Sequence, residues 1–417
     1  MREDARDAAA RVDESRLWQR HAEMAKLGAI PNNGVNRAAL SAEDIAARRL
    51  LVGWARERGY GVSIDGIGNL FLRRAGADPD AAPVLTGSHM DSQPRGGRFD
   101  GIYGVLAGFE ALIAMDEAGV TTRRPVEVVA WTNEEGGRFA PCTMGSMIHT
   151  GARPLADVLD VTDDKGVKLR DALATTLAAT PEAKPRDFKT PAAGYIEAHI
   201  EQGPLLENAE KTIGVVTGIQ GLRWFNIEVS GKTDHAGTTP LALRKDALRD
   251  AIAIINALTE LARDPADVTR FTVGRMLVTP NSPNSVASHV LFSVDLRHPD
   301  PARIRALGDA VEPLARKAAK SCAVEVTPTL HDDPCVFDSG VAGAIESAAR
   351  NLGFAHMRLP SGASHDAMYM ARVCPAGMIF VPCEQGISHN EAENAKPADL
   401  AAGARVLTAA LIELANR

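Results

Sequence analysis

Short apolar runs that end in polar clusters constrain the fold of this chain more than any other feature. One run begins at Val84 and leads into a Gly-Ser-His sequence at His89, and another, Val126–Trp131, leads into Thr-Asn-Glu-Glu. A helical pattern over 104–118 lies between them. Such alternation predicts a mainly parallel sheet with helices on both faces, whose polar clusters gather where the strands end. We therefore predict an α/β fold with a mixed, mainly parallel sheet.

The length and a change of pattern after Gly221 predict a second domain. A chain of 417 residues is longer than one hydrophobic core usually supports. The order strand-helix-strand-strand-helix-strand after Gly221 is typical of a ferredoxin-like α+β domain. We predict this inserted domain at 219–330, and a catalytic domain formed by 1–218 and 331–417. The expected elements of the insertion are strands at Phe225–Val229, Phe271–Leu277, Val290–Leu296 and Ala323–Pro328, and helices at Ala247–Ala262 and Pro301–Lys320.

Composition favours a small-molecule substrate over a polyanionic partner. The net charge of −7 argues against nucleic acid or an anionic membrane surface as the main partner. The N-terminal twenty residues lack the apolar stretch of a signal peptide, and no segment has the apolar length that spans a bilayer. Five cysteines, an odd number without a Cys-x-x-Cys pair, are typical of a reducing compartment. We expect a cytoplasmic protein.

His89 and Asp100 are the first candidate metal ligands. Imidazole is a good zinc donor, and a carboxylate has two oxygens that can bridge a pair of cations. Asp100 lies in a Gly-Gly-Arg-Phe-Asp-Gly sequence, where backbone without side-chain bulk can approach an ion. Asp91 can orient the His89 imidazole, or can lie close to it without contact. For His89 or Asp100 taken alone, a solvated loop is the simpler interpretation.

Two carboxylates and two further histidines complete a possible set. Glu134 and Glu135 follow a strand and point in different directions, so one can bind a metal ion while the other acts as general base. His199 lies in a strand-like run, and His389 follows another. A single histidine in such a place is more often a hydrogen-bonded core residue. Five ligand-type residues, each next to a predicted strand of one sheet, favour a two-metal site.

Seven motifs occur in order from residue 87 to residue 391. They are Gly-Ser-His-x-Asp-Ser, Gly-Gly-Arg-Phe-Asp-Gly, Asn-Glu-Glu-Gly-x-Arg-Phe, Glu-Ala-His-Ile-Glu-Gln-Gly-Pro, Asp-His-Ala-Gly-Thr-Thr-Pro, Asp-Leu-Arg-His and Ser-His-Asn-Glu. Over nearly its whole length the chain resembles the hydantoinase/carbamoylase family of amidases. That family includes N-carbamoyl-L-amino-acid hydrolases, β-ureidopropionases and allantoate amidohydrolases, and belongs to the larger clan of di-zinc aminoacylases, aminopeptidases and carboxypeptidases.

The resemblance implies two divalent metal ions held by five residues. Asp100 would bridge the two ions, His89 and His199 would complete one site, and Glu135 and His389 the other. Glu134 would deprotonate the bridging water and later protonate the leaving nitrogen. Zn²⁺ is the expected metal, and carboxylate-rich sites of this type also accept Mn²⁺ or Co²⁺.

The resemblance also implies the substrate-binding residues. His235 would donate to the developing oxyanion and Arg297 would bind a substrate carboxylate. Asn284 and Gln202 would bind neighbouring polar groups, and the backbone of Gly362 and Ala363 would lie near the carboxylate.

The implied reaction removes the carbamoyl group from an N-carbamoyl-L-amino acid. Allantoate and β-ureido acids remain alternative substrates, and an N-acyl amino acid, a dipeptide or a non-catalytic binding role is less favoured. The inserted domain would serve as a lid and as the interface of a homodimer, with His235 acting in its own site or in that of the partner chain.

Overall fold

The computed structural model describes residues 1–417 and separates them into two compact units. The first consists of 1–218 and 336–417, and the second of 219–335. The insertion predicted at 219–330 therefore extends five residues further. The reason is the last strand of the second unit, which was expected to end at Pro328 but continues to Asp332.

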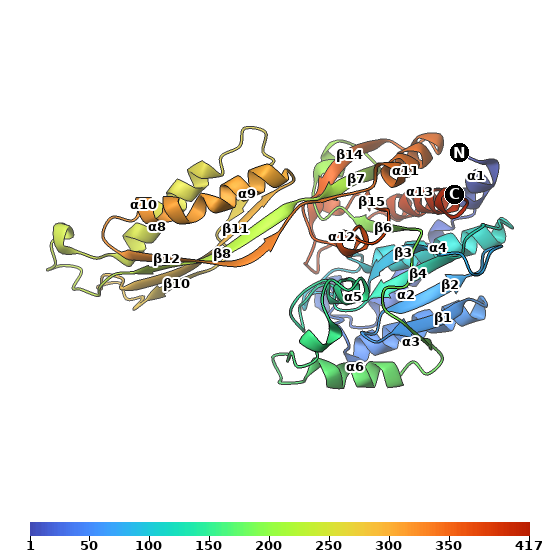
Figure 1. Ribbon diagram of the computed structural model, residues 1–417, viewed down its shortest axis with the longest axis horizontal. Helices are drawn as coiled ribbons and strands as arrows, with labels where there is room; N and C mark the ends of the chain where they lie inside the picture. The colour runs from blue at the N-terminus through green and yellow to red at the C-terminus, as the bar shows by residue number, and fades with distance from the viewer. The chain divides into compact units, whose positions relative to one another are not determined.

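The first unit is built on a ten-stranded mixed sheet (Figure 1). The strand order is β13-β7-β15-β6-β3-β4-β2-β1-β5, with β14 beside β7. The strands are β1 (Gly61–Asp65), β2 (Leu70–Arg74), β3 (Val84–His89), β4 (Val126–Trp131), β5 (Lys184–Arg186), β6 (Gly194–Ile200), β7 (Ile213–Ile219), β13 (Cys335–Val336), β14 (His356–Ser361) and β15 (Ala376–Val381).

Four neighbouring strands, β15, β6, β3 and β4, run parallel at the centre of this sheet. Every residue of these four strands is buried, as expected for parallel strands covered on both faces. Antiparallel partners, β7 on one side and β2 on the other, flank them. The predicted α/β fold with a mainly parallel central sheet is confirmed.

Alternate residues of β4 point to two different helix layers. Val126, Val128 and Ala130 belong to the core that contains α4 and α13, whereas the Trp131 ring lies 5.5 Å from that of His149 in α5. The helices of the first unit are α1 (Glu3–Ala10), α2 (Glu14–Ala25), α3 (Ala42–Glu57), α4 (Ile102–Glu117), α5 (Met144–His149), α6 (Leu169–Ala178), α7 (Leu205–Asn208), α11 (Ser339–Asn351), α12 (Ala367–Met370) and α13 (Pro397–Ala415).

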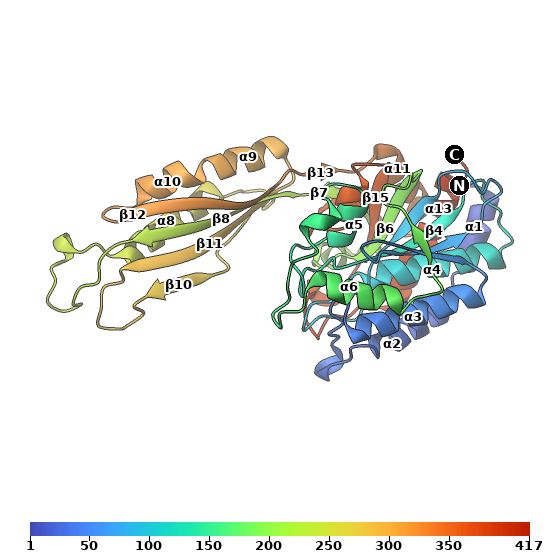
Figure 2. The ribbon, with the colours of Figure 1, turned by 60° about the horizontal axis from the view of Figure 1, so that its bottom comes forward.

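The second unit is a five-stranded antiparallel sheet with helices on one face (Figure 2). Its strand order is β10-β11-β8-β12, with β9 beside β11. Burial alternates along β11, because only one face of the sheet packs against the helices. The elements are β8 (Gly221–Ser230), α8 (Ala247–Leu261), β9 (Arg270–Thr272), β10 (Met276–Thr279), β11 (His289–His298), α9 (Pro301–Asp309), α10 (Val311–Ala318) and β12 (Ala323–Asp332).

The β-α-β-β-α-β succession is present in this unit, but two of its elements are divided. The strand expected at 271–277 is two strands, β9 and β10, with Gly274 between them. The helix expected at 301–320 is α9 followed by α10, which meet at Ala310. Pro313 explains this break, since it has no N–H to donate to the carbonyl of Asp309. No helix in either unit is long and apolar enough to cross a membrane.

Candidate functional site

The carboxyl ends of the central strands bring the predicted ligands together at one edge of the sheet. His89 is the last residue of β3, and Glu134 and Glu135 follow β4 within four residues. His199 is the penultimate residue of β6, and His389 lies in the loop after β15. Because parallel strands end on the same side, residues from four distant segments become neighbours.

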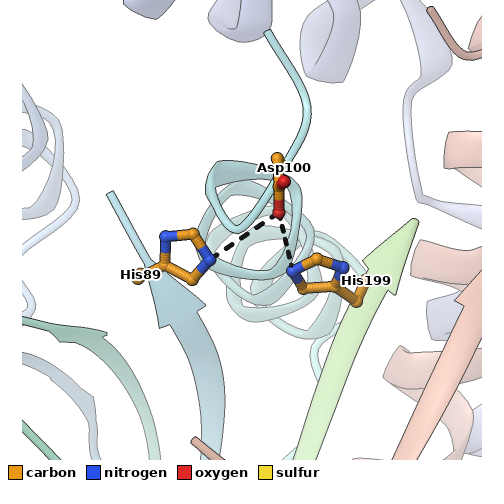
Figure 3. A group of neighbouring side chains, drawn as sticks. All are labelled: His89, Asp100 and His199. Carbon is orange, nitrogen blue, oxygen red and sulfur yellow. Dashed lines mark ion pairs between the residues drawn. The ribbon is translucent and has the colours of Figure 1, made fainter. Parts of the chain in front are cut away.

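The first group of neighbouring side chains consists of His89, Asp100 and His199, all buried (Figure 3). The Asp100 Oδ1 atom lies 3.3 Å from His199 Nε2 and 3.8 Å from His89 Nε2. The two histidines come from adjacent strands, β3 and β6, and both rings point at the carboxylate at the start of α4.

Backbone carbonyls fix the orientation and the tautomer of both imidazoles. His89 Nδ1 donates to the carbonyl of Asp91 at 2.8 Å, and His199 Nδ1 donates to that of Ile200 at 2.9 Å. A carbonyl oxygen can only accept, so each Nδ1 carries the proton and each Nε2 is left to face Asp100. This is the arrangement of metal-ligating histidines, in which the outer nitrogen donates to a second partner.

The second group is Asp100, Glu135 and His389, and it shares Asp100 with the first. His389 Nε2 lies 3.3 Å from both Asp100 Oδ2 and Glu135 Oε2. Gln93 Nε2 donates to Glu135 Oε2 at 2.8 Å. The His389 side chain is 51% exposed, whereas the members of the first group are almost fully buried. Asp100 thus presents one oxygen to each group.

Gly101 permits the close approach of Asp100 and the two histidines. Its φ is +65°, a left-handed conformation, and a Cβ there would lie 2.2 Å from the His89 ring. Its N–H donates to His199 Nε2 at 3.1 Å, which is consistent with a lone pair on that nitrogen. A glycine directly after the aspartate is therefore a packing requirement of this site.

Asp91 contacts the site in two ways. Its carbonyl bonds the His89 imidazole, while its carboxylate lies 4.0 Å from His89 Nδ1. The carboxylate instead accepts the backbone N–H groups of Glu134 and Glu135, at 3.1 and 3.2 Å. The sequence left two alternatives open, and the second one holds: the Asp91 carboxylate lies close to the imidazole without a bond to it. The carboxylate instead anchors the turn that carries the two glutamates.

Burial of several carboxylates dominates the electrostatics of the site. Burial raises the pKa of Glu134 well above its usual value, and the nearby Asp366 and Glu135 add to this. Burial, together with Asp100, raises the pKa of Glu135 to about 8. Burial would also raise the pKa of Asp100, but the neighbouring imidazoles of His199 and His389 lower it well below its usual range. Several buried carboxylates this close together require positive charge nearby.

Divalent cations fit this donor set. Each group combines imidazole nitrogen with carboxylate oxygen, the ligands that zinc and related metals take in catalytic sites. The Nε2 atoms of the first group face a carboxylate oxygen, so only a proton or a cation can make that contact favourable. Glu134 belongs to neither group, and its Oε2 lies 3.5 Å from His89 Nε2.

Several residues outside the predicted set surround these groups. The His365 ring packs edge-on against His199, with ring centroids 4.5 Å apart. Glu197 forms a further group with both histidines, but it already accepts from Ser88 and from the N–H of Ala367. The Ser-His-Asp sequence at 364–366 is a signal for His365. Glu197 is the first residue of the Glu-Ala-His-Ile-Glu-Gln-Gly-Pro motif, and a charged residue inside an apolar run is the signal for it.

The predicted substrate residues of the first unit already have partners within the chain. Gln202 Nε2 donates to Asp100 Oδ2 at 3.0 Å and to Ser388 Oγ at 3.2 Å. The N–H of Ala363 donates to Ser361 Oγ at 3.1 Å, in the loop that follows β14, and Gly362 beside it is exposed. Gln202 is thus part of the Asp100 environment.

The predicted residues of the second unit lie in two places. His235 and Asn284 are exposed and adjacent, since His235 pairs with Ser285 in an isolated bridge. Arg297 lies in β11, where its guanidinium bonds Asp295 at 2.9 Å. Arg297 lies eight positions along β11 from His289, which at about 3.3 Å per position is roughly 26 Å.

Known proteins resemble the chain over nearly its full length. The model of peptidase family M20/M25/M40 matches residues 85–413. An N-carbamoyl-L-amino-acid amidohydrolase of Rhizobium meliloti is 40% identical over 97% of both chains. A ureidoglycolate hydrolase of Oryza sativa is 34% identical over 97% of this chain and 85% of its own.

A solved structure agrees with these relatives. The crystal structure of an amidase of the hydantoinase/carbamoylase family from Burkholderia multivorans has a TM-score of 0.91 and 44% identity, with 97% of this chain and 98% of the other covered. The chain is therefore a hydrolase of C–N bonds that belongs to peptidase family M20/M25/M40, among the amidases of the hydantoinase/carbamoylase group.

Proposed function

We propose that this chain is a binuclear metal-dependent amidohydrolase that cleaves N-carbamoyl-L-amino acids to the amino acid, ammonia and carbon dioxide. The observation that carries the proposal is the pair of ligand groups that share Asp100, with the unligated Glu134 beside them. The name of the Rhizobium meliloti relative supports the choice of substrate.

Five residues would hold two divalent cations, Zn²⁺ or alternatively Mn²⁺ or Co²⁺. His89 and His199 would bind one, Glu135 and His389 the other, and Asp100 both. When bound, the cations polarise the scissile carbonyl and acidify a water molecule. Glu134, which belongs to neither ligand group, would take a proton from water and pass it to the leaving nitrogen.

Asp91 supports this chemistry by position. Its carboxylate holds the N–H groups of Glu134 and Glu135, so the general base and a metal ligand keep a fixed spacing.

Six further residues would bind the substrate. His235 would donate to the oxyanion and Arg297 would bind the carboxylate, while Gln202, Asn284, Gly362 and Ala363 would contact the remaining polar groups.

The distance between His235 and Arg297 favours a shared site in a homodimer formed through the second unit. Beyond His289 the backbone pairing continues away from Arg297, from Gly231 with Ser288 to Asp234 with Val286. His235 and Arg297 of one chain therefore lie further apart than a small ureido acid can span. We infer that Arg297 acts together with the partner subunit's His235.

Mixed dimers test this sharing. Neither His235→Ala nor Glu134→Gln homodimers should turn over substrate. Heterodimers of the two variants contain one site with an intact Glu134 and an intact histidine, so they should regain up to about half of the wild-type activity per dimer. Heterodimers that remain inactive, with their composition verified by mass spectrometry, would contradict the sharing of His235.

Another ureido acid is the second candidate substrate, because the Oryza sativa relative is named a ureidoglycolate hydrolase. The test is ammonia release by chelator-treated protein reloaded with Zn²⁺, Mn²⁺ or Co²⁺. The panel holds N-carbamoyl-L- and D-amino acids, N-carbamoyl-β-alanine, allantoate, ureidoglycolate and, with amino-acid detection, N-acetyl amino acids. We expect the highest kcat/KM for an N-carbamoyl-L-amino acid and no turnover before reloading. Faster cleavage of N-acetyl amino acids would overturn the assignment.

A further inference from the structure

Glu393 links the two loops that carry Asp100 and His389. It is 1% exposed and lies four residues after His389. Its Oε1 atom accepts the backbone N–H of Phe99 at 2.9 Å and that of Asp100 at 3.1 Å. A carboxylate near the C-terminal end of the chain thus fixes the backbone of a residue almost three hundred positions earlier.

Ser388 extends this link to the Asp100 carboxylate. Its hydroxyl lies 2.9 Å from Asp100 Oδ2 and 3.3 Å from Glu393 Oε2. Asp100 Oδ2 is also the oxygen that faces His389. Glu393 therefore determines the position of the Asp100 backbone directly, and that of its second oxygen through Ser388.

Gly97 shows how closely Glu393 fits between the loops. A Cβ at residue 97 would lie 2.1 Å from the Glu393 carboxyl group, much less than atoms can approach. The sequence predicts that the glycine pair before Asp100 lets the backbone approach an ion. In the structure, Gly97 instead makes room for the Glu393 side chain.

We propose that Glu393 is a positioning residue that holds Asp100 against the His389 loop and so sets the affinity of the cation site formed by Asp100, Glu135 and His389. The inference rests on the proposed function in one respect, that divalent cations occupy the two groups. His89 and His199 are held by strands, so the site that they form depends less on Glu393. Outer partners of this kind typically change metal affinity by about 10–100-fold.

Calorimetric titration of the chelator-treated full-length protein with Mn²⁺ alone tests the proposal. Wild type should bind two Mn²⁺ per chain. Glu393→Ala should lower the affinity for the more weakly bound Mn²⁺ by about 10–100-fold, and the affinity for the other Mn²⁺ by less than about threefold. Gly97→Ala keeps every hydrogen-bonding group but displaces Glu393, so it should cause the same selective loss if Glu393→Ala fails to fold.

Glu393→Gln separates positioning from charge. The amide oxygen can still accept from Phe99 and Asp100, and the amide nitrogen can donate to Ser388, so both affinities should stay within about threefold of wild type. Glu391→Ala is the matched control, because Glu391 lies in the same loop but pairs with the exposed Arg95 and not with the backbone of Phe99 or Asp100. It should leave both affinities unchanged.

The outcomes separate the two proposals. Wild-type protein that binds no Mn²⁺ would contradict the proposed function. Wild type that binds two ions while Glu393→Ala or Gly97→Ala binds them equally well would overturn the positioning role alone. A Glu393→Gln protein as impaired as Glu393→Ala, or an impaired Glu391→Ala control, would also overturn it.

Discussion

The two ligand groups that share Asp100 are held by the fold in different ways. His89 and His199 lie at the ends of neighbouring buried strands, and backbone carbonyls fix both rings. Glu135 and His389 lie in loops, and the His389 side chain is half exposed. The comparison teaches that the sheet itself positions a group whose histidines lie on strands, here called strand-borne. A group whose residues lie in loops, here called loop-borne, depends on side chains that bond its ligands from outside, such as Gln93 and Glu393.

Glu134 belongs to neither group, and its replacement should have the largest effect. Glu134→Gln keeps the shape of the side chain but removes the proton acceptor, so kcat should fall by about 10³-fold or more. The content of bound cations, measured by atomic emission, should stay at the wild-type value because Glu134 belongs to neither group. Glu207→Gln, on the short helix α7, is the control and should leave kcat unchanged.

Retained turnover in Glu134→Gln would remove its role as general base. Loss of a cation would instead place Glu134 among the ligands and change the division into two groups.

Removal of one histidine from each group compares them directly. His199→Ala leaves a buried space beside His365 and should destabilise the protein by about 2 kcal/mol or more, besides the loss of cation binding. His389→Ala should lose one cation with a change below about 1 kcal/mol, because the side chain is half exposed. Urea unfolding without metal and Mn²⁺ stoichiometry measure both effects. Equal destabilisation would contradict the distinction between strand-borne and loop-borne groups.

Asn69 lies between β1 and β2 and holds the turn after β4 that carries Glu134 and Glu135. It is a third way in which the fold positions a residue of the site. Its Oδ1 atom accepts the N–H of Thr132 at 2.9 Å, two residues before Glu134, and its amide donates to Asp65 and to the carbonyl of Gly145. Asn69→Ala should lower kcat by about 10-fold through misplacement of Glu134, with KM and cation content unchanged. Asn351→Ala on the surface of α11 is the control. A change in KM alone would show that the turn does not depend on Asn69.

Replacement of His21 tests the packing next to the shared Asp100, because the His21 ring contacts Phe99. At neutral pH its effect on stability should be the smallest of these. The ring is buried against Phe99 and Tyr103, with centroids 5.2 and 6.1 Å away, and burial lowers the pKa of His21 to about 3. The unfolded chain, with an ordinary histidine pKa near 6.5, takes up this proton first as the pH falls. The stability linked to His21 is therefore complete above pH 6.5 and declines toward pH 3.

At pH 5 the free energy of unfolding should be lower by about 2 kcal/mol because of His21. His21→Phe should abolish this loss. Urea unfolding of both proteins at pH 8 and pH 5 measures it, with the exposed His331→Asn as control. The same acid sensitivity in His21→Phe would assign the effect to other groups.

Much of the fold follows from local pattern. The β3 and β4 runs, the helix between them and the order of elements in the second unit are visible in the sequence, because hydrophobic periodicity and flanking turn residues report directly on burial. Strands β1, β2, β5, β7 and β14 did not stand out. The prediction also joined α9 to α10 across Ala310, since it did not account for Pro313.

The candidate ligands were chosen from the sequence by residue type, by their place after strands and by resemblance of motifs. The roles of Asp91 and Gly97 were not visible there. Asp91 bonds backbone N–H groups more than forty residues away, and Gly97 is required by a side chain from the other end of the chain. Contacts of this kind are absent from local periodicity because they depend on how distant loops meet.

The sequence by itself therefore determined the class of fold, the family and the set of groups that can carry the chemistry. The tertiary structure alone decided which of them share Asp100, which are held by strands or by loops, and that Glu393 joins two of the loops. The physical reason is that parallel strands align their ends regardless of separation along the chain, so the geometry of the site is a property of the sheet.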